Sequence, residues 1–162
     1  MNLKDKADSI AAAFEKKRSE VKASLEECIK DREAAYDEYR KANTGDRAEN
    51  APLDAAIDHM KKANAKILAT EKFIKTIDAL PDISTYNSVG FVVEFATVRI
   101  QCEDEEFIYR IYPKGISFIE IGIIAADSRL AIAIMGKRAG DIVGVEDTSI
   151  GATIEYKILE VY

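Results

Sequence analysis

The sequence has few of the residue types on which many active sites and metal sites depend. Its 162 residues include no tryptophan, one histidine and two cysteines, Cys28 and Cys102, which lie far apart. No Cys-X-X-Cys pair occurs, which argues against a structural zinc site, and two cysteines are too few for a disulfide framework. A Gly-rich phosphate loop and a nucleophile elbow are also missing, so the sequence offers no signature of a nucleotide-binding enzyme or a serine hydrolase.

Long apolar runs are missing as well. No stretch approaches the roughly 18 uninterrupted apolar residues that a membrane span needs. The sequence opens with Met1-Asn2-Leu3-Lys4-Asp5-Lys6, which is charged helical sequence without a signal-peptide core. We therefore expect a cytoplasmic protein with no membrane partner.

Charge divides the chain into unlike halves. Residues 1–80 carry 16 basic and 16 acidic side chains, whereas residues 81–162 carry 7 and 13, so the second half holds the whole net charge of −6. Neither half is a basic, phosphate-gripping surface. The acidic second half is more suited to docking on protein.

The first 42 residues predict one long helix. Residues 2–42 contain no Gly or Pro. Apolar residues recur at every seventh position, which is typical of a coiled-coil seam and places Cys28 among buried residues. The members of this column are Ala7, Phe14, Val21, Cys28, Ala35 and Ala42.

A second helix returns after a turn at Gly45. Its own column consists of Leu53, Met60, Ile67 and Ile74. Because only an antiparallel arrangement hides both apolar stripes, residues 1–78 predict a two-helix hairpin with its tip near residues 45–52. Pro81 lies in a linker at about residues 79–88.

From residue 89 the apolar period changes to two, which predicts strands. We expect strands at residues 91–100, 107–112, 142–147 and 153–161, with short apolar runs over 116–124. Ser128 would cap a short helix that Gly136 ends. The fold class is therefore α+β, with a helical hairpin followed by an antiparallel β domain (residues 89–162) that carries one short helix.

The turn carries two carboxylates, Asp46 and Glu49, and the spacing allows two interpretations. Asp-X-X-Glu is a capping-box pattern, in which both side chains would bind free N–H groups of the second helix. Pro52 favours the first turn of a helix, which would leave Asp46 and Glu49 in the preceding loop, facing outward.

Other charged residues near the turn are candidates for contacting RNA, although they could also form an ordinary solvated surface. Lys61, Lys62 and Lys66, with Arg40 and Lys41, would form a mild basic strip beside RNA, although a solvated coiled-coil face has the same composition. We expect Arg40, Lys41 and Arg47 to face the RNA. His59 has no Cys, Ser or Asp arrangement around it in the sequence, so we expect it on the solvated surface.

Two stretches resemble one family. Gly45-Asp46-Arg47-Ala48-Glu49-Asn50-Ala51, followed by Ala55-Ala56, resembles the tip motif of the bacterial Gre transcript-cleavage factors (GreA and GreB). Residues 127–137, which begin Asp127-Ser128-Arg129 and end Gly136-Lys137, are similar to a C-terminal segment of that family. The resemblance covers nearly the whole chain, in order.

The resemblance implies an FKBP-like C-terminal domain that grips RNA polymerase at its secondary channel, with Asp127, Ser128 and Arg129 in docking. It also implies that the hairpin inserts toward the active centre, near the 3′ end of the nascent RNA. There Asp46 and Glu49 would help the polymerase hold a second Mg²⁺ and hydrolyse its own backtracked RNA. The chain would act as a monomer and have no stand-alone nuclease activity.

Departures from the family pattern keep other functions open. Pro52, Leu53 and Asp54 replace the residues usual after the tip motif, and Arg129 replaces a proline. A relative that occupies the channel and inhibits or regulates the polymerase without cleavage is one alternative. An FKBP-like prolyl isomerase and a purely structural coiled-coil adaptor are two others.

Overall fold

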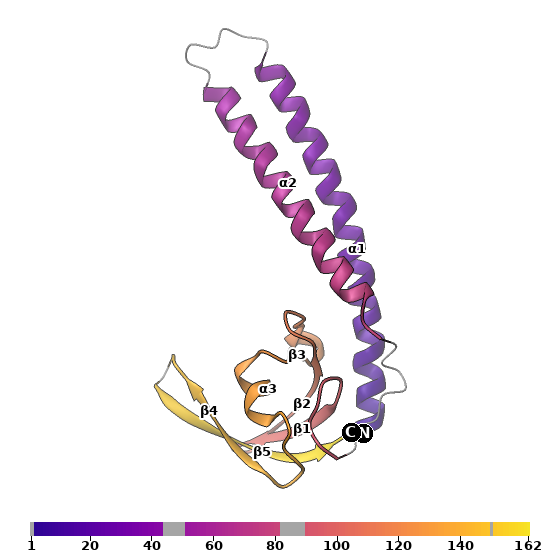
Figure 1. Cartoon of the computed structure of the whole chain (residues 1–162), viewed down its shortest axis with the longest axis vertical. Helices are drawn as coiled ribbons and strands as arrows, with labels where there is room; N and C mark the ends of the chain where they lie inside the picture. The colour runs from indigo at the N-terminus through magenta and orange to yellow at the C-terminus, as the bar shows by residue number, and fades with distance from the viewer. Residues whose placement is uncertain (1, 44–50, 82–89, 150) are drawn as a thin grey trace. The chain divides into compact units, whose positions relative to one another are not determined.

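A computed structural model describes residues 2–43, 51–81, 90–149 and 151–162 (Figure 1). The chain forms two compact units. One, the sheet unit, comprises Met1–Glu15 with Pro81–Tyr162, and the other, the helical unit, comprises Lys16–Leu80. Among the described helices, none is long and apolar enough to cross a membrane.

The helical unit is an antiparallel pair. Helix α1 (Leu3–Ala42) and helix α2 (Ala51–Asp78) run side by side in opposite directions, which confirms the predicted hairpin (Figure 1). The Asn2 side chain caps α1 by accepting a hydrogen bond from Asp5 N at 2.7 Å. Small side chains supply much of the buried seam, whose buried members are Cys28, Ala35, Ala56, Ala63, Ile67 and Ile77.

The sheet unit contains five strands in the order β3-β2-β1-β5-β4. They are β1 (Thr97–Cys102), β2 (Glu105–Tyr112), β3 (Ile123–Ala125), β4 (Ile142–Asp147) and β5 (Ala152–Val161). Three of the pairings are antiparallel, as expected, and the short β2–β3 pairing is parallel. A 3₁₀ turn, η2 (Ile119–Ile121), precedes β3, and helix α3 (Arg129–Ile134) lies between β3 and β4.

Helices cover both faces of this sheet. On one face, α3 buries Ala131 and Ile134 in a core cluster with Val98, Ile100 and Ile111. The first turns of α1 cover the other face through four buried side chains, which are Leu3, Ala7, Ile10 and Phe14. The Phe14 and Tyr112 ring centroids are 4.6 Å apart, and buried Arg110 donates hydrogen bonds to Ala7 O (3.3 Å) and Phe95 O (3.0 Å).

Two sequence expectations need correction. The strand expected at residues 91–100 begins only at Thr97, because Phe95 has a left-handed backbone (φ 68°) and Val92 N bonds Lys137 O at 2.9 Å instead of a strand. The heptad column of α1, expected to pack along a second helix, also packs against two different parts of the protein. Ala7 and Phe14 pack in the sheet unit, whereas Cys28 and Ala35 lie in the helical unit.

Candidate functional site

The end of the helical hairpin positions the segment that carries the predicted tip acids. Asn43 N donates to Tyr39 O at 2.9 Å, which closes the last turn of α1. Helix α2 begins at Ala51 with Pro52 in its first turn, as the sequence predicted. Asp46, Arg47 and Glu49 lie between these helix ends and outside the described residues. With 28 residues at about 1.5 Å each, α2 is about 42 Å long.

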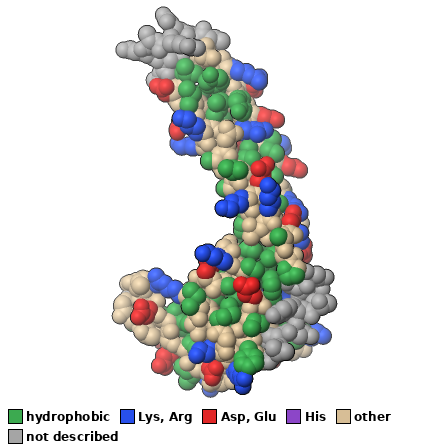
Figure 2. Space-filling model, viewed as in Figure 1, with side chains coloured by type: hydrophobic (Ala, Val, Ile, Leu, Met, Phe, Trp, Pro, Cys, Tyr) green, Lys and Arg blue, Asp and Glu red, His purple; other side chains and the backbone are tan. Residues whose placement is uncertain are grey.

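The described residues next to this segment form an apolar groove edged by charge. It has a volume of about 590 Å³, and its apolar lining residues are Ala42, Pro52, Ala55 and Ala56. Figure 2 shows hydrophobic side chains, in green, gathered on the helices next to the atoms drawn in grey at the top of the view. Glu38, Lys41 and His59 complete the lining.

The candidate RNA-facing residues lie on exposed helix surface. The Arg40 side chain is 77% exposed, and its Nη1 lies 3.4 Å from Asp37 Oδ1. Lys41 is also exposed. These two cations therefore border the tip segment.

His59 lies at the surface, as expected, with a side chain that is 34% exposed, but it also joins the two helices. Its Nδ1 lies 2.9 Å from Glu38 Oε2 and its Nε2 lies 3.4 Å from Asp31 Oδ1, so the ring bridges α2 to α1. The hydrogen bond to Glu38, and next the one to Asp31, raise the pKa of His59 above 6.5, although partial burial opposes them. The signal in the sequence is the seven-residue spacing of Asp31 and Glu38, which places both carboxylates on one face of α1.

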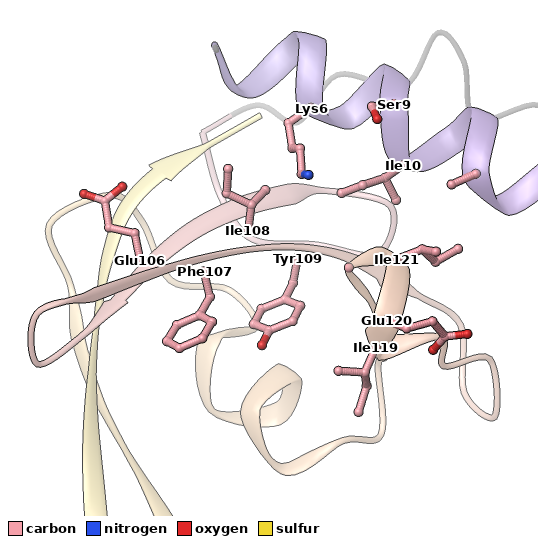
Figure 3. A pocket seen from close by; sticks show the side chains of 12 residues that line it. Lys6, Ser9, Ile10, Glu106, Phe107, Ile108, Tyr109, Ile119, Glu120 and Ile121 are labelled. Atoms are coloured by element: carbon pink, nitrogen blue, oxygen red, sulfur yellow. The ribbon is translucent and has the colours of Figure 1, made fainter.

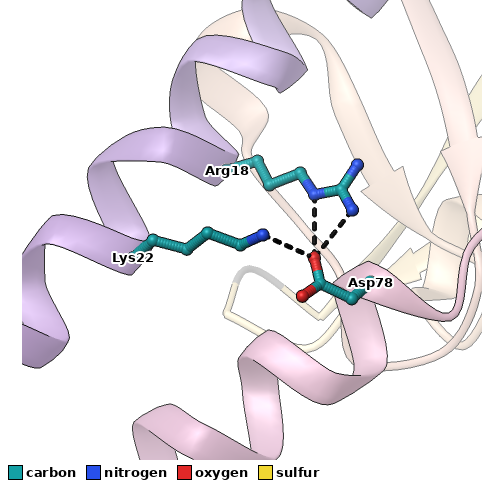
Figure 4. A network of polar contacts seen from close by, with 3 residues as sticks. All are labelled: Arg18, Lys22 and Asp78. Atoms are coloured by element: carbon teal, nitrogen blue, oxygen red, sulfur yellow. Dashed lines mark hydrogen bonds and ion pairs between the residues drawn. The ribbon is translucent and has the colours of Figure 1, made fainter.

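The other end of the hairpin is fastened by a second polar cluster (Figure 4). Asp78 Oδ1 accepts hydrogen bonds from Arg18 Nε (2.9 Å) and Nη2 (2.7 Å), and Lys22 Nζ lies 3.0 Å away. Lys22 and Arg18 hold the pKa of the Asp78 carboxyl below its usual value. A carboxylate at a helix C-terminus is unfavourable by itself, and these two cations offset that cost.

The predicted docking residues surround the start of α3. Ser128 caps the helix, because its Oγ accepts a hydrogen bond from Ala131 N at 3.2 Å. Asp127 Oδ1 accepts from Gly115 N at 3.3 Å, and Arg129 Nη1 donates to Thr148 Oγ1 at 2.9 Å and to Glu146 O at 3.3 Å. On the same helix Ile132 is 64% exposed, which the sequence analysis did not single out.

Within residues 2–43, 51–81, 90–149 and 151–162, no group of three or more His, Cys, Asp or Glu side chains is placed to hold a metal ion. The two tip acids, Asp46 and Glu49, lie outside these residues.

Comparisons with known proteins identify the family. No protein-family model matches the chain. Among solved structures, the chain is similar to GreA factor homolog 1 of Thermus thermophilus, with a TM-score of 0.37, 14% identity, and coverage of 90% of this chain and 94% of that one. It is also similar to GreA/GreB from Nitrosomonas europaea, with a TM-score of 0.37, 24% identity, and coverage of 52% and 64%.

Curated relatives are closer in sequence. The transcription elongation factor GreA of Alkalilimnicola ehrlichii is 32% identical over 119 residues, which cover 72% of this chain and 73% of that protein. GreA of Pseudomonas syringae pv. tomato is 33% identical over 119 residues, with the same coverage. At this identity and coverage, the chain belongs to the GreA family of transcription elongation factors.

Proposed function

We propose that this protein binds RNA polymerase at its secondary channel and stimulates Mg²⁺-dependent cleavage of backtracked nascent RNA, which rescues arrested complexes. The observation that carries this proposal is the antiparallel hairpin. Helix α1 ends at Ala42 and helix α2 begins at Ala51, and the residues between them in the sequence match the family's tip motif. A rod of about 42 Å is long enough to bring two carboxylates to a centre buried inside a larger protein.

Asp46 and Glu49 are the residues proposed to act at the metal. One or two carboxylates alone hold Mg²⁺ weakly, because the ion requires octahedral oxygen ligation and keeps several waters. The two acids therefore supply part of a site whose remaining ligands belong to RNA polymerase, and the protein alone hydrolyses no RNA. When bound, the metal supplies activation of a water and stabilisation of the leaving oxygen.

The basic residues beside the tip would contact the RNA backbone. Arg40 and Lys41 are exposed at the end of α1, and Arg47 belongs to the tip segment. Their charges favour the phosphates of the nascent RNA near its 3′ end without selecting a sequence. Their role is to position the RNA 3′ end.

Docking on the polymerase is proposed to use the surface at the start of α3. Ser128 and Arg129 are held by contacts within the sheet unit, so they shape this surface. Asp127 and Ile132 are exposed and present a carboxylate and an apolar side chain to a protein partner. The protein would dock as a monomer and work in the cytoplasm, where the polymerase is.

The test is RNA length in a stalled, backtracked elongation complex supplied with Mg²⁺. Wild-type protein should shorten the transcript, and Asp46→Ala or Glu49→Ala should abolish shortening while the helical circular dichroism stays unchanged. Glu71→Ala is the matched control, because it removes an exposed acid from α2 far from the tip and should leave cleavage unchanged. Cleavage that persists in both tip variants would contradict the assignment.

A second candidate is a regulator that occupies the channel without cleavage. Pro52 and Asp54 favour it, because both are exposed in the first turn of α2, where they replace residues usual in the family. In the same assay this candidate predicts slowed RNA synthesis and no shortening by the wild-type protein.

A further inference from the structure

The sheet has an open edge on strand β2. Although β3 lies beside β2, it pairs only with Arg110–Tyr112. The preceding part of β2, Glu105–Tyr109, is paired with β1 on one side only. Within the described part of the chain, no strand pairs with the other side of these residues.

The ladder shows which backbone groups face this edge. Ile111 N donates to Ala96 O on the β1 side, whereas Arg110 N donates to Gly122 O on the opposite side, at 2.7 Å. Backbone groups alternate in direction along a strand. The N–H groups of Glu106 and Ile108 therefore point outward, as Arg110 N does, and the N–H groups of Phe107 and Tyr109 point toward β1.

A groove of about 550 Å³ runs along the same edge (Figure 3). In this view Lys6 and Ile10 of α1 point toward Ile108 of β2. The 3₁₀ turn η2 forms one end of the groove, and its Ile119 is 67% exposed. The edge thus combines outward backbone donors with an exposed apolar side chain, Ile119, at the η2 end, whereas Ile10 is buried beneath α1.

Gly122 shapes the closed end of the groove. Its φ is +81°, and a Cβ there would lie 3.0 Å from Ile108 O and 3.3 Å from Ile10 Cδ1. Glycine is needed for this backbone conformation and for the close approach to β2. Pairing of β2 with β3 begins only at Arg110, so Gly122 closes the groove beside Ile108 O and the open part of the edge runs from Ile108 N toward Glu106.

Acidic side chains at the turn that leads into Glu106 indicate the occupant, although Glu106 Oε2 also lies 3.5 Å from Arg99 Nη1. Glu103, Asp104, Glu105 and Glu106 are four consecutive exposed acids where β1 turns into β2. A second copy would bring the same four acids to this edge, so its charge would not complement them. A strand with lysine or arginine side chains complements them.

We propose that the outer edge of β2 binds an extended, basic peptide segment of a partner protein, which adds to the sheet beside Glu106 and Ile108. Main-chain hydrogen bonds to the edge give affinity in this binding mode, and the flanking pockets select alternate side chains. Apolar side chains of the segment pack against exposed Ile119, and its cations lie near the turn at residues 103–106. This site is in the sheet unit and does not depend on the proposed function.

The direct test is a titration of the ¹⁵N-labelled full chain with the peptide acetyl-Lys-Val-Lys-Val-Lys-Val-amide. Binding should be saturable and should slow hydrogen exchange at the Glu106 and Ile108 amides. The Phe107 and Tyr109 amides, already bonded to β1, should change little. No saturation at millimolar peptide, or the largest changes at α3 and β4, would overturn the proposal.

Two variants of Glu106 distinguish the contribution of its backbone N–H to peptide binding from that of its side chain. Proline is tolerated on an edge strand where the N–H points outward, so Glu106→Pro removes one edge donor and should weaken binding at least tenfold relative to Glu106→Ala, which keeps that N–H. Equal affinity for the two variants would refute strand addition. If the amide spectrum shows that Glu106→Pro does not fold, Ile119→Lys is the second variant, because Ile119 is exposed and its replacement should leave the fold intact. Ile119→Lys should also weaken peptide binding tenfold. Unchanged binding would refute the role of the groove in holding the peptide.

Two controls test the occupant. The peptide with glutamate in place of lysine should bind at least tenfold more weakly, and equal binding would refute the basic partner. Sedimentation of the free protein should show no dimer. A concentration-dependent dimer that protects Glu106 and Ile108 would make a second copy the occupant and overturn the proposal.

Discussion

Replacing Phe14 with alanine should destabilise the sheet unit, although Phe14 belongs to a helix that continues into the hairpin. The ring is 2% exposed and packs 4.6 Å from the Tyr112 ring and 6.1 Å from the Phe118 ring, measured between centroids. Truncating a buried phenylalanine costs about 3–5 kcal/mol. A domain has a total stability of roughly 5–15 kcal/mol, so this loss should be plain in any unfolding measurement.

Hydrogen exchange read by segment gives the assay. Phe14→Ala should speed exchange in β1 and β2 and leave α2 unchanged, because regions of a protein open with their own free energies. Val21→Ala is the matched control, since Val21 is the next member of the same heptad column but lies in the helical unit and is half-buried. It should speed exchange in α2, by less. If Phe14→Ala instead loosened α2 and left β1 and β2 protected, the packing of α1 on the sheet would be refuted.

Two further changes test single contacts. His59→Gln should flatten the pH dependence of hairpin stability. The bridge to Glu38 and Asp31 raises the pKa of His59 in the folded state, so it contributes fully to stability below about pH 6.5. This contribution is lost as the pH rises through the folded pKa. Thermal unfolding followed by helical circular dichroism at pH 6 and pH 8 measures this effect. If the melting temperature changes between the two pH values by the same amount in wild type and variant, the prediction is wrong. Ser128→Ala should cost about 0.5–2 kcal/mol through loss of the α3 cap, measured by urea unfolding. Ser128→Asp, which keeps an acceptor at that position, should lose less.

Local signals predicted most of the fold. The absence of Gly and Pro from residues 2–42, and the proline at position 52, predicted helices whose observed bounds are Leu3–Ala42 and Ala51–Asp78. Alternating apolar residues predicted β4 at its observed bounds and β5 within one residue at its start. Ser128 predicted the α3 cap because a capping hydrogen bond spans only three residues.

Features that depend on distant partners escaped prediction. The left-handed Phe95 is held by contacts to Ile111 O and the Arg110 guanidinium, which no local pattern reveals. The heptad column gave no means to tell a seam against α2 from a seam against the sheet, because both need the same apolar spacing. The His59 bridge joins residues 21 and 28 positions apart. The predicted tip acids lie outside the described residues, so they stay predictions.

The composition of the hairpin seam changes along its length, and this change bears on the proposed function. Toward the tip the buried residues are small, with Ala35 and Ala56 at the seam, whereas Ile67 and Ile77 lie toward the base. An alanine buries about three fewer carbons than an isoleucine, and each buried CH₂ contributes about 0.8 kcal/mol.

The apolar seam therefore holds the base more firmly than the tip end. At the base, Asp78 adds ion pairs with Arg18 and Lys22, and nearer the tip His59 bridges α2 to Asp31 and Glu38 of α1. A hairpin built this way opens locally near its tip before it opens at its base. In the proposed function, two carboxylates join ligands on another protein, and local opening of the adjoining helix ends would permit adjustment while the rod stays intact.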